Sequence, residues 1–250
     1  MRLQHLTWQE VETYLRQRTD IIVPIGSTEQ HGPNGLVGTD AICPETVAWE
    51  VGERYGVLVA PTQSLGMAQH HLAFPGTISL RPSTLIAVLR DTLLSLSRHG
   101  FTHVFFLNGH GGNIATLSAA FAEVYAERSL LDGDVRRGEL NLTNNNWFAG
   151  PRVRKLAESL YGDAEGTHAT ASEVALSWFA RPDAVKQVEM SPRLAPQGSA
   201  QCDAEEFRRR FPDGRMGSDP SLASIEHGRR FFEASVDDVW EAYRAFTGRE

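Results

Sequence analysis

The feature of this sequence that most constrains its fold is a repeated order of apolar run, polar turn and helix-like stretch. Residues 101–107 form the strongest apolar run, which leads directly into the glycine-rich turn 108–113 and then a helix-like segment over 114–128. The run 20–26, rich in β-branched residues, is typical of a strand buried on both faces. This alternation predicts an α/β fold with a mostly parallel sheet, in one domain over residues 1–250.

The local signals place the boundaries of the expected elements. Thr7 with Glu10 forms a capping box, and Gly100 is a helix C-terminal cap. Pro44 and Pro220 each suit the first position of a helix. We expect helices over 10–18, 44–55, 83–99, 114–128, 169–179 and 220–246, strands over 20–26, 57–61, 101–107 and 138–143, and a long irregular excursion over 183–219, at a subunit contact.

Composition narrows the class of protein. With 250 residues and 41% hydrophobic content, the chain is able to bury a sizeable core. A formal net charge of -7 disfavours a nucleic-acid or anionic-membrane partner, because both need a basic face. Cys43 and Cys202 lie far apart, the sequence has no 18-residue apolar run, and its N-terminus lacks the pattern of a signal peptide. We therefore expect a cytoplasmic protein.

Acidic and imidazole side chains follow two of the predicted strands. Glu29 and His31 come just after the strand 20–26, Asp40 follows nine residues after His31, and His110 comes just after the strand 101–107. The carboxyl ends of parallel strands meet at one edge of a sheet, so these groups should converge there. Carboxylates and imidazoles hold Zn²⁺ or Mn²⁺, and adjacent ions generate a hydroxide nucleophile at neutral pH. The sequence predicts a metallohydrolase.

A centre with two metal ions needs a bridging ligand, and Asp40 is the natural one because a carboxylate has two oxygens. We pair His31, Asp40 and His110 on a softer metal, and Glu29 and Asp40 on a harder one. Glu173 is the best candidate for the missing third ligand of the second ion. Gln30, between Glu29 and His31, is expected to point away.

Simpler interpretations apply to each residue alone. Glu29 or Asp40 by itself is more often a cap or a solvated loop carboxylate, by roughly 3 to 1. A lone His110 is equally able to hydrogen-bond only the backbone. The joint position of these residues past predicted buried strands favours a cluster.

The glycine-rich turn has a rival interpretation as a dinucleotide-binding loop. That fingerprint needs a third glycine, which is missing here, and a strand-end acidic residue further on. Gly111 and Gly112 better suit a close approach of the backbone to a substrate, with N–H groups offered to a developing oxyanion.

Several motifs together resemble the creatininase (creatinine amidohydrolase) family, in an order and spacing that run through nearly the whole chain. They are Glu29-Gln30-His31-Gly32-Pro33 with Thr39-Asp40, Phe74-Pro75-Gly76-Thr77, Asn108-Gly109-His110-Gly111-Gly112-Asn113, His168 with Glu173, and Gly217-Ser218-Asp219-Pro220 with Glu226-His227-Gly228. The resemblance implies a three-layer α/β/α sandwich and a binuclear site of Zn, Mn or Fe. It also implies homo-oligomers, often hexamers, and hydrolysis of a carbon–nitrogen bond in a small cyclic or linear amide.

Carried over residue by residue, the family's metal ligands fall on Glu29, His31, Asp40 and His110. Creatininases proper have a further ligand, a glutamate two residues after the last histidine, where this chain has Gly112. Glu173 is the candidate replacement, as a ligand and in catalysis. His168 matches the histidine thought to shuttle protons, although from the residues alone it is equally an exposed helix-start residue.

The resemblance limits the choice of substrate. Creatininases proper hold the creatinine ring with a tryptophan and an aspartate, where this chain has Ala164 and Glu165. The family also includes formamidopyrimidine-nucleotide deformylases and peptidases that mature a peptide-derived redox cofactor. His71 is a candidate for contacting substrate. Trp147 either supplies the missing aromatic face or is a packing residue.

The expected mechanism is hydroxide attack on an amide carbon between two divalent ions, with His168 carrying the proton to the leaving nitrogen. Ser27 and Thr28 are not expected to be nucleophiles, because no base is obviously placed beside either. The alternative from another class is a metal- or nucleotide-binding protein without turnover.

Overall fold

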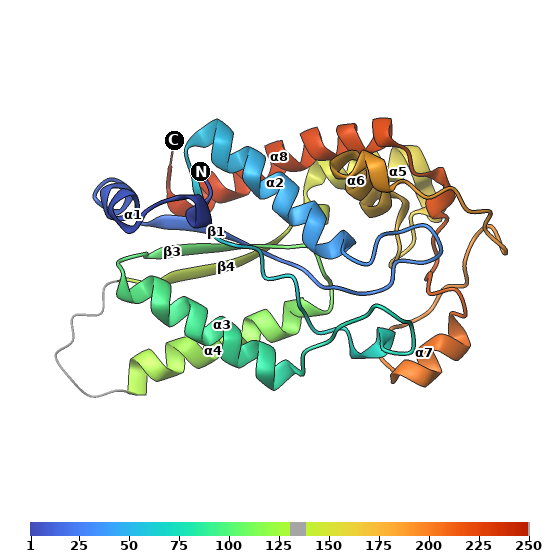
Figure 1. The fold of residues 1–250 in the computed structure, drawn as a ribbon, viewed down its shortest axis with the longest axis horizontal. Helices are drawn as coiled ribbons and strands as arrows, with labels where there is room; N and C mark the ends of the chain where they lie inside the picture. The colour runs from blue at the N-terminus through green and yellow to red at the C-terminus, as the bar shows by residue number, and fades with distance from the viewer. Residues whose placement is uncertain (131–138, 250) are drawn as a thin grey trace.

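A sheet of parallel strands forms the centre of the computed structural model, which describes residues 1–130 and 139–249 (Figure 1). Within these residues the sheet has four strands in the order β2-β1-β3-β4. The strands are β1 (Asp20–Ile25), β2 (Leu58–Val59), β3 (His103–Asn108) and β4 (Asn141–Asn146). The predicted parallel sheet is confirmed.

The three longer strands end level with one another. Ile25 of β1 pairs with Asn108 of β3, which in turn pairs with Asn146 of β4. Every residue of β1 is buried, as expected for a parallel strand covered on both faces. The segments that follow β1 and β3 therefore leave the sheet at the same edge, which brings their side chains close together.

Helices cover both faces of the sheet (Figure 1). On one face lie α2 (Thr39–Tyr55), α5 (Pro151–Tyr161), α6 (Ala171–Ala180) and α8 (Ile225–Thr247), and on the other α3 (Pro82–Arg98) and α4 (Asn113–Leu130). Phe105 and Phe106 alternate along β3, so Phe105 packs in the first core and Phe106 in the second. The three-layer α/β/α arrangement is thus confirmed.

Shorter elements complete the fold. Helix α1 (Trp8–Leu15) begins with the predicted capping box, in which the Thr7 N–H donates to Glu10 Oε2 at 2.7 Å. Helix α7 (Ala204–Arg210) lies within the excursion that we expected to be irregular, and neither it nor α5 was predicted. Single 3₁₀ turns occur at Leu3–His5, Gln69–His71, Trp147–Ala149, Gly162–Ala164, Pro182–Ala184 and Pro220–Leu222. None of the described helices is long and apolar enough to cross a membrane.

Two predicted helix starts are wrong. Helix α8 begins at Ile225, where the Ser224 side chain accepts a hydrogen bond from the backbone N–H of His227, whereas Pro220 opens a separate 3₁₀ turn. Helix α2 begins at Thr39, so Asp40 lies in its first turn and Pro44 lies inside it. The predicted strand over 138–143 is found as β4, shifted towards its carboxyl end; Gly138 is outside the described residues.

The start of α2 is wedged between the ends of β1 and β3. Pro44 has no N–H, so it cannot donate the usual helical hydrogen bond to the Asp40 carbonyl. That carbonyl instead lies against Gly26 and Gly109, where an added Cβ atom would sit 2.1 Å from its oxygen. Glycine at both positions lets the helix approach the strand ends, and this contact places Asp40 beside the segments that follow β1 and β3.

Candidate metal centre and the cavity above it

Acidic and imidazole side chains converge at the carboxyl edge of the sheet. Glu29 and His31 follow β1, His110 follows β3, and Asp40 comes from the first turn of α2. All four are buried. The structure therefore brings these four expected ligands together. The other expected site residues beside them are Glu173 of α6, which was the fifth expected ligand, His168 just before that helix, and His71 of the 3₁₀ turn Gln69–His71.

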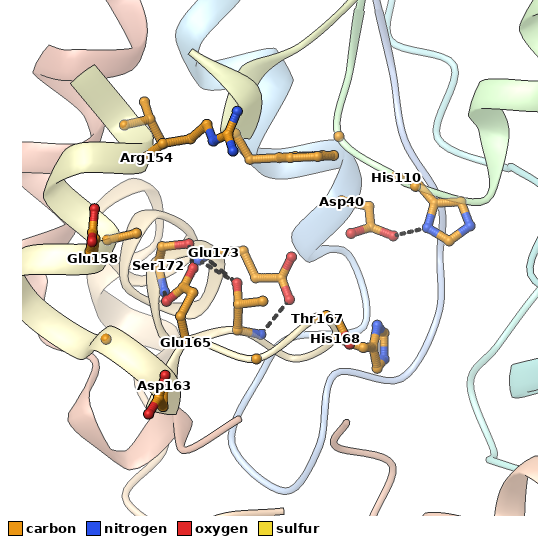
Figure 2. A pocket seen from close by; sticks show the side chains of 18 residues that line it. Asp40, His110, Arg154, Glu158, Asp163, Glu165, Thr167, His168, Ser172 and Glu173 are labelled. Atoms are coloured by element: carbon orange, nitrogen blue, oxygen red, sulfur yellow. Dashed lines mark hydrogen bonds and ion pairs between the residues drawn. The ribbon is translucent and has the colours of Figure 1, made fainter. Parts of the chain in front are cut away.

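Asp40 occupies the middle of the cluster. Its Oδ1 lies 3.0 Å from His31 Nε2, and its Oδ2 lies 3.0 Å from His110 Nδ1 (Figure 2). Glu173 Oε1 approaches the same His31 nitrogen at 3.9 Å. The two rings therefore meet opposite oxygens of one carboxylate, which is the arrangement that a bridging ligand requires.

Glu29 is fully buried, and neither of its carboxylate oxygens accepts a hydrogen bond from any described residue. His71 Nε2 lies 3.2 Å from Oε1 and His110 Nε2 lies 3.3 Å from Oε2, but neither contact is a hydrogen bond. A buried carboxylate without hydrogen-bond donors is costly unless a cation balances it. Both oxygens of Glu29 therefore suit a metal ion.

The potential ligand atoms form three groups, each with its atoms within 4.8 Å of one another. The first group is Glu29, Asp40 and His110, and the second is His31, Asp40 and Glu173. The third joins Glu29 and His31 to His168. The first two groups share Asp40 alone and together fit two adjacent divalent ions.

This grouping differs from the pairing expected from sequence. We expected His31 and His110 to hold the same ion with Asp40, but they contact different oxygens of that carboxylate. His110 is instead grouped with Glu29, and His31 with Glu173. Each group then offers one imidazole and two carboxylates, so the two sites have the same ligand chemistry rather than one softer and one harder set.

The charges of the cluster shift its pKa values strongly. Burial by itself lowers the pKa of His31, but the charges of Asp40, Glu173 and Glu29 outweigh it and raise that pKa to about 10. In the same way burial is outweighed at His110, whose pKa Glu29 and Asp40 raise to about 9. Burial raises the pKa of Glu173 to about 7, although the His31 charge opposes this. Without ions, the two rings thus carry protons among the carboxylates.

Gln30 points into the site, contrary to expectation. Its Oε1 accepts a hydrogen bond from the Gly32 N–H at 2.8 Å, and its side-chain nitrogen lies 2.9 Å from His71 Nδ1, His168 Nε2 and the Gly214 carbonyl. The Gly214 carbonyl can only accept, and we assign the second amide hydrogen to His71 Nδ1, which leaves none for His168 Nε2. His168 Nε2 lies 2.9 Å from the Gln30 backbone carbonyl, which can only accept, so this ring nitrogen carries the hydrogen.

The tautomer of His168 follows from that contact. With its hydrogen on Nε2, the neutral ring has a free lone pair on Nδ1, which lies 3.8 Å from Glu29 Oε1. Burial and the neighbouring histidines lower the pKa of His168 well below the usual range for histidine. The ring is therefore neutral and able to accept a proton at Nδ1.

A cavity of about 660 Å³ opens above this cluster. Its floor includes Asp40, His110, His168 and Glu173. Its outer wall comes from α5 and the turns on either side, which contribute Phe148, Arg154, Glu158 and Asp163 (Figure 2). The candidate metal centre is thus accessible from one side.

Of the four residues expected to contact substrate, only Gly111 lines the cavity. No atom lies within 4 Å of where its Cβ would be. Gly112 does not line it, and a Cβ there would sit 2.3 Å from His110 Nε2. His71 lies beside Glu29 and is not among the residues that line the cavity. Trp147 is 1% exposed and packs in the core.

Three further residues of the site were not found from the sequence: Gln30 as a partner of the histidines, and Phe148 and Arg154 on the cavity wall. Phe148 is the neighbour of Trp147 and brings an aromatic ring to the cavity. Gly150 followed by Pro151 is a signal for the start of α5 that was available in the sequence, since Pro151 is the first residue of that helix.

Comparisons with known proteins find relatives that match most of the chain. The family model described as Creatinine amidohydrolase matches residues 4–243. The mycofactocin precursor peptide peptidase of Mycobacterium ulcerans is 30% identical over 238 residues, covering 87% of this chain and 82% of that protein. The 3-dehydro-scyllo-inosose hydrolase of Thermotoga maritima is 26% identical over 259 residues, covering 94% and 79%. A local match to the Mycolicibacterium smegmatis peptidase, 39% over 108 residues, covers 43% of that protein.

Solved structures of creatininase match over almost the full chain. A crystal structure of creatinine amidohydrolase (creatininase) superposes with a TM-score of 0.84 at 25% identity, covering 98% of this chain and 96% of that one. Creatininase structures described as an Mn form and as a Zn-Zn type each match with a TM-score of 0.82. The relatives thus share the fold and include proteins with metal centres.

Proposed function

Because the chain belongs to the creatininase family of metal-dependent hydrolases, we propose that it hydrolyses a carbon–nitrogen bond of an amide in the cavity above Asp40. The observation that carries this proposal is the shared position of Asp40. It belongs to two groups of buried ligands at the floor of an open cavity. An isolated structural ion would need neither a second group nor access from the cavity.

Two divalent ions would be held by Glu29, Asp40 and His110 on one side and by His31, Asp40 and Glu173 on the other. One imidazole and two carboxylates suit Zn or Mn, and Fe is the third candidate. When bound, such ions lower the pKa of water and polarise a carbonyl oxygen. Glu173 takes the place of the creatininase glutamate, because Gly112 has no room for a side chain against His110.

His168 is the proposed proton carrier. Its Nδ1 accepts a proton from the attacking water. Its Nε2–H stays bound to the Gln30 carbonyl and holds the ring in place. The same Nδ1 then donates to the leaving nitrogen, which is a poor leaving group unless it is protonated. Gly111 brings main chain to the cavity and is the proposed contact for the substrate carbonyl.

Creatinine is not the expected substrate. Ala164 and Glu165 replace the ring-holding pair, and the cavity offers one aromatic wall, Phe148, rather than two. The match to a peptidase over 87% of this chain favours a linear amide such as a short peptide. A formamidopyrimidine nucleotide is the other candidate from the family resemblance.

We also propose that the protein is a homo-oligomer in the cytoplasm, and the family resemblance favours a hexamer. Light scattering tests the number of subunits.

The test of the proposed function begins with elemental analysis of the purified protein. Cyclic amides, formamides and short peptides are then assayed for release of ammonia, formate or amine. Asp40→Asn should lose both ions and nearly all turnover, whereas the exposed control Asp237→Asn should change neither. Full metal content in Asp40→Asn would rule out a bridge.

His168→Gln separates proton transfer from metal binding. We expect this variant to keep both ions and to lose rate by about 100- to 10,000-fold, the usual contribution of a general base. Loss of an ion would instead make His168 a ligand of the third group. A protein that binds two ions but hydrolyses no amide would be a metal-binding protein without turnover.

A further inference from the structure

We propose that the substrate carries an anionic group, a carboxylate or a phosphate, and that Arg154 binds this group at the mouth of the cavity. The inference rests on the proposed function, since it concerns the same cavity. It narrows the substrate from amides in general to acidic amides.

Arg154 is placed to meet a ligand. Among the described residues that line the cavity, it is the only arginine or lysine. Figure 2 shows its side chain reaching from α5 across the top of the cavity, towards the side where Asp40 and His110 lie. In the same view Glu158 and Asp163 stay on the far side, away from Asp40. Arg154 therefore offers a group that extends from the metal centre the cation of the described cavity lining.

The Arg154 guanidinium makes no hydrogen bond or ion pair with any described residue. Other helical arginines of this chain pair with a carboxylate one helical turn away, as Arg54 does with Glu50 and Arg229 does with Glu233. Glu158 lies one turn after Arg154 on the same helix, yet the two are not paired. The five donors of Arg154 remain available for a bidentate contact with a carboxylate or phosphate.

The charge of the cavity floor permits an anion. Glu29, Asp40 and Glu173 together carry less negative charge than two divalent ions would balance. Glu165, another acidic residue of the wall, accepts a hydrogen bond from the Ser172 N–H, and burial raises its pKa. With ions bound, the floor itself would therefore not repel an anionic group held at Arg154.

The cavity also has room for a substrate of this kind. A volume of about 660 Å³ is in the range of pockets that enclose a whole drug-sized molecule, well beyond a single small ring. Phe148 presents an apolar surface to the same cavity. The lining therefore fits an amide group over Asp40 and His168 and an acidic end at Arg154.

The experiment compares matched substrates and matched variants on the metal-loaded protein. The compounds are N-formyl dipeptides ending in a carboxylate, the same dipeptides ending in a primary carboxamide, and an N-formyl aminoalkyl phosphate. Wild type should prefer an acid to its carboxamide. Arg154→Met should lower kcat/KM for the acid by about 10- to 100-fold, mainly through KM, and leave the carboxamide within about twofold. Arg154→Lys should recover part of the loss.

The control is Lys155→Met, which removes the neighbouring exposed charge on α5 without touching the cavity. The carboxylate and phosphate compounds distinguish the two sources of the anion. Equal losses for acid and carboxamide, no loss for either, or the same change in Lys155→Met would overturn the proposal.

A binding measurement distinguishes failure of the anion site from failure of the proposed hydrolysis. The uncleaved compounds are titrated by calorimetry into the His168→Gln protein with and without Arg154→Met. If wild type hydrolyses none of them and none of the cyclic amides, formamides and short peptides assayed above, the proposed function fails, while tighter binding of the acids that depends on Arg154 still supports the anion site. If no acidic compound binds more tightly than its carboxamide, the anion site is refuted.

Discussion

Removal of the metal ions should leave protons in their place, and returning the ions should release them. Without ions, His31 with a pKa of about 10 and His110 with a pKa of about 9 are both charged at pH 8. A histidine binds a metal only through a deprotonated nitrogen. Loading both sites at pH 8 should therefore release about two protons from these rings, besides any proton lost by bound water.

The sign of the pH dependence follows from the same shifts. Glu173, with a pKa of about 7, takes up a proton as the pH falls below 7, so more protons are displaced and the ions bind more weakly in acid. The raised pKa values of His31 and His110 stabilise the metal-free protein fully below their ordinary value of 6.5, and this contribution is lost as pH rises through about 9 and 10. Alkaline pH should therefore lower the stability of the metal-free protein, because these two residues lose their protons.

Isothermal titration calorimetry measures the number of protons released when Zn²⁺ or Mn²⁺ is added to protein whose ions have been removed with a chelator. The observed enthalpy is plotted against the ionisation enthalpy of several buffers at pH 8, and the slope gives the number of protons released. We expect at least about two. Asp237→Asn is the control and should give the wild-type slope. A slope below one would show that the rings are neutral before metal binding, and the electrostatic reasoning would then be wrong.

Four further variants test the glycine-rich turn, the core and the surroundings of His168. Gly112→Glu should lose metal rather than gain a ligand, because its Cβ would collide with a metal-binding ring, whereas Gly111→Ala has open space and should keep both ions by elemental analysis. Trp147→Ala should lower the free energy of unfolding by about 3–5 kcal/mol in denaturant titration, and a loss below 1 kcal/mol would contradict its place in the core. Gln30→Ala keeps the main-chain carbonyl that holds His168 but removes the amide that lies against His71 Nδ1 and His168 Nε2. It should keep both ions but lose turnover, and its pH–rate profile should change; an unchanged profile would count against this role.

Much of the fold was predictable because its strands carry strong local signals. The runs that contain Ile21 and Phe105 are apolar on both faces, which indicates a parallel sheet, and the polar residues after them had to meet at its edge. The start of α2 was not predictable in the same way. Pro44 is a good first residue of a helix, but contact with Gly26 and Gly109 extends the helix back to Thr39.

The residues of the candidate metal centre were easier to predict than their grouping. Residue type and position after a strand pointed to Glu29, His31, Asp40 and His110, which the structure brings together. Which oxygen of Asp40 faces which ring depends on side-chain orientation in three dimensions, and the sequence carries no signal for it. The role of Gln30 was missed for the same reason, because its partner His168 is distant in the chain.

The contact of the Asp40 carbonyl with Gly26 and Gly109 makes the centre all-or-none. Both ligand groups depend on one residue, and that residue is seated by main-chain atoms rather than by an adjustable side chain. A single methyl group at either glycine would push the helix away from both strands at once. A substitution at Gly26 or Gly109 should therefore abolish binding at both metal sites together. Such a variant should not yield a protein that holds one ion.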